Sequence, residues 1–248
     1  MSTTRVVLLG GTKGMGRAIA RRLSARGDKV LLLGRNLEEL ERSAADLAVR
    51  SGGVPIASAR CDLSDSSTFA GAFAHAEETL GGVDRVVVTA ADFATQEALE
   101  VSPERATALC TVNFANTVGF CEHARGAIAR AGGGVLCVFS SVAGDRGRKP
   151  VVIYGASKAG LSAYLEGLDH KFRREGLRTV CVKPGFVHTS MTAGLSPPPF
   201  AGEADEVAGI AIKAMDRGTP VVYAPSMWRW VMLVIRNIPR IVMRRIGF

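Results

Sequence analysis

Residues 6–23 read VVLLGGTKGMGRAIARRL, and this stretch decides the fold. Apolar residues lead into a glycine-rich turn that carries one lysine, and a helical pattern of small residues follows the turn. Gly10, Gly14 and Gly16 stand in G-x-x-x-G-x-G spacing between the expected strand and the expected helix. Glycines in that position let the backbone approach a phosphate closely, and the helix N-terminus directs amide groups at it. The stretch therefore predicts a phosphate-binding turn. Because the spacing departs from G-x-G-x-x-G, a purely structural turn is the alternative.

Six more short apolar runs alternate with segments of helical pattern. They cover residues 30–33, 54–59, 83–88, 135–139, 179–182 and 220–223. Buried parallel strands have such continuous apolar runs, and helices between them cover both faces of the sheet. We therefore predict an α/β fold with a doubly wound (Rossmann) parallel sheet of about seven strands. Such folds bind ligands beyond the carboxyl ends of the strands.

The length and charge of the chain indicate how it is organised. Its 248 residues are 47% apolar, which suffices for one large core and favours a single domain. The formal net charge is +8, and residues 228–248 contain five arginines and no acid. We expect a body of residues 1–225 and a basic amphipathic C-terminal extension of residues 226–248.

The cysteines indicate a reducing compartment. Cys61, Cys110, Cys121, Cys137 and Cys181 are scattered and lack the spacing of metal ligands. An odd number of cysteines in apolar surroundings predicts buried, reduced thiols and no metal site. The first apolar run is too short for a signal peptide and passes directly into the glycine turn. We therefore expect a cytoplasmic protein.

A basic residue follows the second apolar run. In "LLLGRN", Arg35 occupies the position at which NAD-binding folds usually present an acid to the ribose 2′-hydroxyl. A guanidinium there would bind a 2′-phosphate through two hydrogen bonds, and Lys13 of the glycine turn would add a second cation. The sequence therefore predicts NADP(H) rather than NAD(H). A solvated loop arginine is the alternative.

Tyr154 and Lys158 of "YGASK" share one face if this segment is helical. A phenol has an ordinary pKa near 10, and an adjacent ammonium lowers that pKa because it favours the phenolate. The pair therefore predicts a general acid. Ser141, at the end of an apolar run in "VFSSVAG", precedes the tyrosine by thirteen residues.

These features together resemble the short-chain dehydrogenase/reductases over nearly the whole chain. The matching motifs are the glycine turn, Asp62 in "CDLS", Asn113 in "TVNFANTVG", the set of Ser141, Tyr154 and Lys158, and "KPGFVHT" at residues 183–189. The resemblance implies a ketone/alcohol oxidoreductase that uses a nicotinamide cofactor.

The resemblance also implies a role for each matching residue. Ser141 would hydrogen-bond the substrate oxygen, and Tyr154 would protonate it as hydride arrives. Lys158 would hold the nicotinamide ribose and lower the tyrosine pKa, and Asn113 would hold a water that connects Lys158 with solvent. Asp62 would contact adenine, and Thr189 with the backbone near Val187 would hold the carboxamide. The cofactor-binding residues implied are Gly10, Thr12, Lys13, Gly14, Met15, Gly16, Arg35, Asp62, Ala90, Lys158, Pro184, Gly185, Val187 and Thr189.

Two positions depart from the family pattern. Where the family usually shows N-N-A-G after the fourth strand, this sequence has Thr89, Ala90, Ala91 and Asp92, and Leu9 replaces a threonine before the glycine turn. The first change removes an asparagine that would fix the strand end near the cofactor. Neither change removes a catalytic group.

The C-terminal residues 227–248, "MWRWVMLVIRNIPRIVMRRIGF", combine basic and apolar residues at helical intervals. A charge-free run of residues 230–235 is too short to span a bilayer. A basic amphipathic segment with tryptophans is typical of contact with a membrane surface, here the inner face, and packing on the protein is the alternative. Pro239 would kink any helix through the segment. A helix would place Arg229, Arg236, Arg240 and Arg244 on one side and Val231, Val234, Ile235, Ile238, Ile241 and Val242 on the other.

The chain is similar to decaprenylphosphoryl-2-keto-ribose reductases in its tail and in the stretches "SSVAGDRGRK" and "KPGFVHTSM". This similarity implies a ketone on a lipid or lipid-linked carrier, such as a polyprenylphosphoryl 2-keto-pentose. A β-ketoacyl or ketosphinganine-type reductase would use the same residues.

Other classes of function remain as alternatives. An NADP-binding sensor or scaffold would share the fold without turnover, because fold does not settle function. The sequence shows no module that reads nucleic acid, so we expect none as a partner. In related enzymes the helical segments that correspond to residues 103–130 and 154–175 form homodimers or homotetramers.

Overall fold

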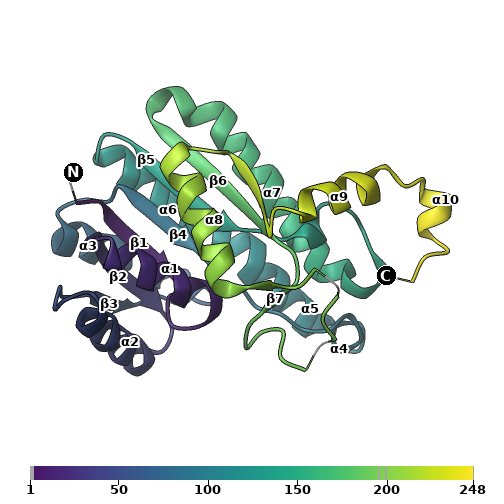
Figure 1. The fold of residues 1–248 in the computed structure, drawn as a ribbon, viewed down its shortest axis with the longest axis horizontal. Helices are drawn as coiled ribbons and strands as arrows, with labels where there is room; N and C mark the ends of the chain where they lie inside the picture. The colour runs from purple at the N-terminus through teal and green to yellow at the C-terminus, as the bar shows by residue number, and fades with distance from the viewer. Residues whose placement is uncertain (1–2, 195, 199, 248) are drawn as a thin grey trace.

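The strands of the protein form one parallel sheet, as the apolar runs predict. The computed structural model describes residues 3–194, 196–198 and 200–247. Seven parallel strands pair in the order β3-β2-β1-β4-β5-β6-β9 (Figure 1). The strand order reverses between β1 and β4, and in such sheets ligands usually bind at that point, beyond the carboxyl ends of the strands. The strands are β1 (Arg5–Leu9), β2 (Lys29–Gly34), β3 (Ala57–Arg60), β4 (Arg85–Val88), β5 (Gly134–Phe139), β6 (Leu177–Pro184) and β9 (Val221–Ala224).

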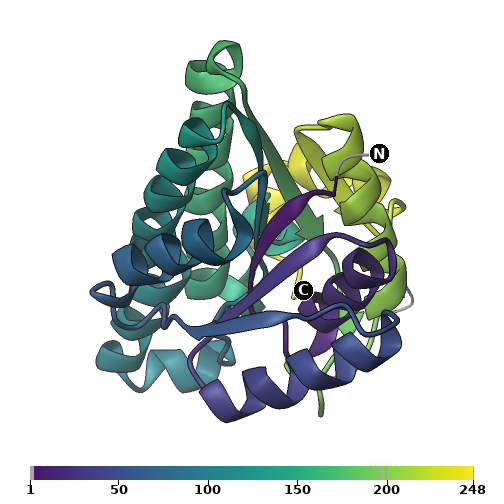
Figure 2. The same cartoon turned by 90° about the vertical axis from the view of Figure 1, so that its left-hand side faces the viewer.

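Helices cover both faces of the sheet (Figure 2). Successive strand residues point to opposite faces, so Val7 and Leu9 contribute to one core and Val6 and Leu8 to the other. The first core is covered by α3 (Thr68–Leu80), α6 (Thr117–Arg130) and α7 (Val152–Phe172). The second is covered by α1 (Gly14–Ala25), α2 (Leu37–Arg50) and α8 (Ala204–Arg217). The predicted doubly wound fold is confirmed.

Most of the shorter elements follow the carboxyl ends of the strands, whereas the 3-10 turn Arg173–Glu175 directly precedes β6. The shorter elements are α4 (Gln96–Glu100), α5 (Pro103–Cys110), a π-helical turn (Thr111–Asn116), three 3-10 turns (Val142–Gly144, Lys149–Val151 and Arg173–Glu175), the paired strands β7 (Val187–His188) and β8 (Gly202–Glu203), and the helices α9 (Trp228–Asn237) and α10 (Arg240–Met243).

The third strand is shorter than predicted. The apolar run of residues 54–59 led us to expect a strand over its whole length, but β3 begins at Ala57. Pro55 has no backbone N–H to donate to a neighbouring strand, so the run cannot pair through that residue. Pairing starts two residues later, where Ala57 lies opposite Leu31 of β2.

The C-terminal extension forms two helices instead of one kinked helix. α9 ends at Asn237, and Pro239 is the N-cap of α10. The buried face of α9 consists of Trp228, Met232 and Ile235, which pack against Val142. Val234, expected on the apolar face, is 66% exposed. Both helices lie at one end of the molecule (Figure 1).

Two further observations concern the compartment and the membrane. All five cysteines are free thiols, and four of them are buried, as their scatter predicts. Among the described residues, no helix has both the length and the apolar content needed to cross a membrane.

Candidate active site

The glycine turn is packed too tightly at Gly10 and Gly16 for any residue with a side chain. Gly10 has φ +95°, and a Cβ there would lie 2.7 Å from the backbone nitrogen of Ala90. A Cβ on Gly16 would overlap the carbonyl oxygen of Gly10. The next helix, α1, begins at Gly14. The amide groups in the first turn of a helix have no intrahelical partner, and here no side-chain cap accepts from them. The turn therefore has the open amides and close backbone approach that a dinucleotide pyrophosphate needs.

Tyr154 and Lys158 lie on one face of α7, next to the end of β5. Lys158 is only 2% exposed, and its Nζ donates a hydrogen bond to the carbonyl oxygen of Phe139 at 3.0 Å. The same Nζ lies 5.8 Å from the centroid of the Tyr154 ring. Ser140 donates through Oγ to the backbone oxygen of Lys158 at 2.9 Å and so ties the helix to the strand end. Ser141 caps the turn that follows, with Oγ accepting from the Ala143 amide at 3.1 Å.

The acid–base properties of this pair follow from burial. Burial raises the pKa of Tyr154 to about 12, and the nearby Ser141 hydroxyl opposes this rise. Burial also lowers the pKa of Lys158 to about 8. The sequence led us to expect a tyrosine pKa lowered by the lysine. The structure gives the opposite direction because loss of hydration outweighs an ammonium that sits 5.8 Å from the ring centre.

Asn113 is buried and only 1% exposed. Its Nδ2 donates to the backbone oxygen of Asp92 at 2.7 Å, and its Oδ1 accepts from the backbone nitrogen of Asp92 at 2.7 Å. Both polar groups of the side chain are therefore engaged in holding the segment after β4. The residue sits in the π-helical turn between α5 and α6, a type of local distortion that is frequent at functional sites.

A cavity of about 500 Å³ opens beside Tyr154. Ser141 and Tyr154 line it, as do five residues predicted to contact the cofactor, namely Met15, Pro184, Gly185, Val187 and Thr189. Most of the remaining wall is apolar, including Phe93, Val142, Phe186, Phe200 and Trp228. Phe93 packs edge-on against the Tyr154 ring, with the ring centroids 5.3 Å apart. Val142 and Phe186 stand in the motifs "VFSSVAG" and "KPGFVHT", and Trp228 stands in the tail, whereas no motif pointed to Phe93.

The other predicted cofactor residues lie outside this cavity. Arg35 follows β2 and is exposed, and the hydrogen bonds and ion pairs of the described residues do not include its guanidinium. Asp62 follows β3, and its Oδ1 accepts from the backbone and hydroxyl of Ser64. Lys13 reaches across to α2, where its Nζ pairs with Glu39 at 2.9 Å. Half-buried Thr12 lies in the glycine turn.

A family model described as short chain dehydrogenase matches residues 4–199. The chain belongs to the short-chain dehydrogenase family. It is 32% identical to an uncharacterized oxidoreductase of Mycobacterium tuberculosis over 97% of this chain and 96% of that protein. It is 31% identical to carbonyl reductase family member 4 of Xenopus tropicalis over 76% of this chain and 77% of the relative. A solved short-chain type dehydrogenase/reductase from Mycobacterium ulcerans shares the fold, with TM-score 0.81, 22% identity and coverage of 90% and 89%.

Hydrogen bonds and one ion pair hold residues 89–92, where this short-chain dehydrogenase departs from the family pattern. Thr89 Oγ1 donates to the carbonyl oxygens of Leu9 and Gly10, at 3.1 Å each. The hydroxyl thus ties the end of β4 to the glycine turn. Asp92 is held by Asn113 and by an ion pair with Arg105 at 2.9 Å.

The tail of this short-chain dehydrogenase forms one wall of the cavity. Trp228 Nε1 donates to the Phe200 carbonyl oxygen at 3.1 Å, and the indole lies against Gly185, where a Cβ would overlap it. Val231 and Ile235 of α9 line the cavity as well. Thr192 holds the segment that follows β7. Its Oγ1 accepts from the Thr189 amide at 3.1 Å and donates to the Val187 carbonyl oxygen at 2.7 Å. The tryptophans at the start of the tail were the only sequence signal for the contact between the tail and the cavity.

Proposed function

We propose that the protein reduces a ketone to a secondary alcohol with NADPH. The observation that carries this proposal is the placement of Ser141 and Tyr154 on the wall of one cavity, with the Lys158 ammonium buried beneath the tyrosine ring. Family membership supports oxidoreductase chemistry of this kind. The glycine turn fits the dinucleotide, because α1 begins there without a side-chain cap and its first-turn amides are open to a phosphate.

In this mechanism the chain positions one oxygen atom and supplies one proton. The carbonyl oxygen of the substrate lies between the hydroxyls of Ser141 and Tyr154, and both donate hydrogen bonds to it. A bound nicotinamide supplies the hydride. Tyr154 transfers its proton to the oxygen as negative charge develops there, and Lys158 stabilises the phenolate that remains. The elevated pKa of Tyr154 keeps the phenol protonated, and therefore able to donate, throughout the physiological range.

The preference for NADPH would rest on Arg35. Glu39 already pairs with Lys13, which leaves Arg35 as the cation placed to bind a 2′-phosphate through its fork of N–H groups. We expect Arg35→Asp to raise the KM for NADPH by about 100-fold and to lower the KM for NADH, because a carboxylate repels the phosphate and accepts from a ribose hydroxyl. Steady-state kinetics with both cofactors measure this. Unchanged KM values would mean that the ribose 2′-phosphate does not contact Arg35. Arg42→Asp, on the exposed face of α2, is the matched charge control.

The substrate we propose is an apolar or lipid-linked ketone, such as a polyprenylphosphoryl 2-keto-pentose. The mostly apolar wall of the cavity supports this class, and so does the exposed apolar face of α9, where Trp230 is 65% and Val234 is 66% exposed. That face would let the protein meet a substrate held at a membrane surface.

The first test is NADPH oxidation with two ketones, the lipid-linked 2-keto-pentose and a water-soluble short-chain β-ketoester. We expect the lipid-linked ketone to be turned over with the higher kcat/KM, in detergent and in vesicles. Trp230→Ser combined with Leu233→Ser should slow only the vesicle-borne reaction, whereas Val49→Ser with Val101→Ser, two still more exposed apolar residues elsewhere, should not. Turnover of the ester alone would assign a soluble or acyl-type ketone. NADPH binding without turnover of any ketone would favour a sensor or scaffold.

A further inference from the structure

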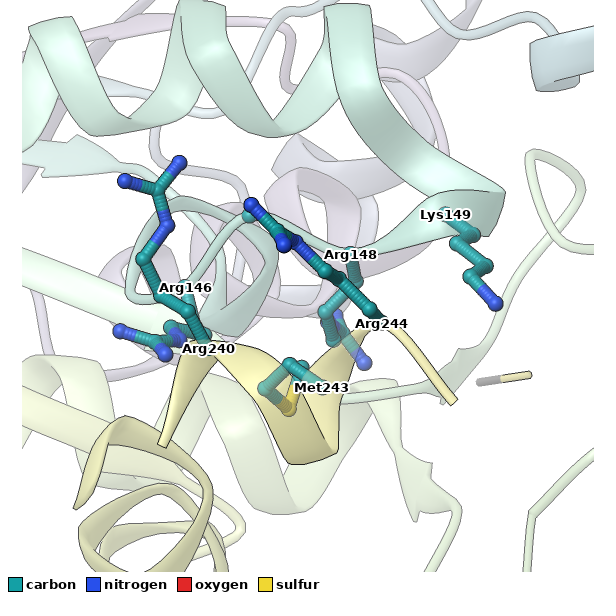
Figure 3. Close-up of a pocket in the computed structure, with 7 residues that line it drawn as sticks. Arg146, Arg148, Lys149, Arg240, Met243 and Arg244 are labelled. Carbon is teal, nitrogen blue, oxygen red and sulfur yellow. The ribbon is translucent and has the colours of Figure 1, made fainter. Parts of the chain in front are cut away.

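A second cavity of about 340 Å³ lies beside the tail and is lined by cations. Two segments far apart in the sequence form it, the loop after β5 and the end of the tail (Figure 3). Figure 3 shows their side chains interleaved around this space. The lining contains five basic residues and no acid, its members being Arg146, Gly147, Arg148, Lys149, Arg240, Met243 and Arg244.

The positive charge of this cavity is not neutralised by neighbouring acids. Ion pairs among the described residues include none of its five basic side chains. The loop itself carries one acid, Asp145, which pairs with Lys183 at 2.6 Å and accepts from the Tyr223 hydroxyl at 2.6 Å. Residues 226–248 contain no acid at all. Such a concentration of unpaired cations favours a bound anion.

Arg148 provides independent evidence for a missing partner. Its Nε is the single buried side-chain nitrogen or oxygen, within the part of the chain that the structure describes, that has no hydrogen-bond partner. Native proteins rarely leave such a group unsatisfied, because burial without a hydrogen bond costs free energy. Arg148 also lines the cavity beside Tyr154, so it borders both spaces. A ligand that satisfies this guanidinium would therefore reach toward the active site.

The position of the tail arginines is fixed by the same loop. Arg146 donates through Nη2 to the carbonyl oxygen of Ile238 at 2.8 Å, between α9 and α10. The buried face of α9 anchors the preceding part of the tail on Val142. The cluster is therefore assembled by the fold and does not depend on chance proximity of two free segments.

We propose that this cavity is an anion subsite that binds a phosphate ester group of the ketone substrate. The assignment rests on the proposed function, because it takes Tyr154 as the reaction centre that the substrate must reach. Several guanidinium forks around one space suit the multiple oxygens and charge of a phosphate ester better than a single carboxylate. Residues of the glycine turn do not line this cavity, so it is distinct from the place of the cofactor pyrophosphate.

The test measures binding without turnover. Isothermal titration calorimetry of the full chain saturated with NADP⁺, which blocks cofactor phosphate sites, would compare geranyl phosphate with uncharged geraniol. We expect the phosphate to bind at least tenfold more tightly. Arg240→Gln with Arg244→Gln should weaken geranyl phosphate about tenfold, because both arginines line the cavity. Arg229→Gln with Arg245→Gln, two exposed tail arginines outside it, should change the affinity less than about twofold.

Three outcomes would overturn the subsite. These are equal binding of geraniol and its phosphate, equal losses in the two double variants, and wild-type binding to phosphatidylglycerol vesicles through Arg240 and Arg244 without any binding of soluble geranyl phosphate. The last result would assign the cations to bilayer headgroups. The Arg229→Gln/Arg245→Gln variant, whose changes lie outside both cavities, should reduce a neutral β-ketoester as fast as the wild type does. If neither protein reduces any ketone, the proposed function fails and the calorimetric result still decides whether the anion binds.

Discussion

Replacing Tyr154 with phenylalanine should lower kcat for ketone reduction by about a thousandfold and leave NADPH affinity unchanged. The phenol lies on the cavity wall next to Ser141, where the proposed mechanism makes it the proton donor to the substrate oxygen. Phenylalanine keeps the ring that packs against Phe93 and loses only the hydroxyl. Stopped-flow measurement of NADPH oxidation separates the chemical step from binding, and fluorescence titration gives the NADPH Kd.

The same helix offers a matched control. Tyr164, also on α7, donates its hydroxyl to Glu122 Oε1 at 2.7 Å and does not line the cavity. Tyr164→Phe should keep kcat within about twofold of wild type while lowering stability by roughly 2 kcal/mol, because it removes one hydrogen bond to a charged group. A full rate in Tyr154→Phe, or an equal loss in both variants, would exclude Tyr154 as the proton donor.

The fold could be predicted because its signals are local. Most strands of the sheet are short apolar runs, although β3 (ASAR) is not, and a buried parallel strand needs nothing more specific than such a run. The glycine turn is likewise predictable from the sequence, since Gly10 and Gly16 occupy positions where a Cβ would meet backbone atoms. The third strand was misplaced by three residues at its start because Pro55 removes a backbone donor that the apolar pattern does not reveal.

The site was predicted less completely because its properties depend on burial and on distant segments. The spacing of Tyr154 and Lys158 correctly placed both on one helix face, but the direction of the tyrosine pKa depends on how much water the fold removes around the hydroxyl. The cationic cavity needs Arg148 and Arg244 to meet across almost a hundred residues. Periodicity in the tail also misassigned Val234, since the face that α9 buries is set by the neighbour it packs on.

Lys158→Met should abolish the pH dependence that we expect for the wild-type enzyme above pH 8. Burial lowers the pKa of Lys158 to about 8, and kcat/KM reports the ionisation of the free enzyme. If reduction needs the ammonium, wild-type kcat/KM for NADPH is flat near pH 7 and falls tenfold per pH unit above pH 8. The variant should show a kcat/KM about a thousandfold lower with no break at that pH. Lys171→Met, exposed near the end of the same helix, should keep the wild-type profile.

Stability distinguishes this loss from simple unfolding. A cation whose pKa falls from 10.5 to about 8 on folding leaves the unfolded chain with more bound protons between those values. The contribution of Lys158 to the free energy of unfolding therefore rises with pH across that window and is unfavourable below it. Lys158→Met removes the desolvated charge together with the hydrogen bond to Phe139, so the two losses oppose each other at pH 7. Urea unfolding at pH 7 and pH 9 should show a variant about as stable as wild type at pH 7 and less stable relative to it at pH 9. A variant that is unfolded at pH 7, or one that is folded and fully active, would contradict the role of the ammonium.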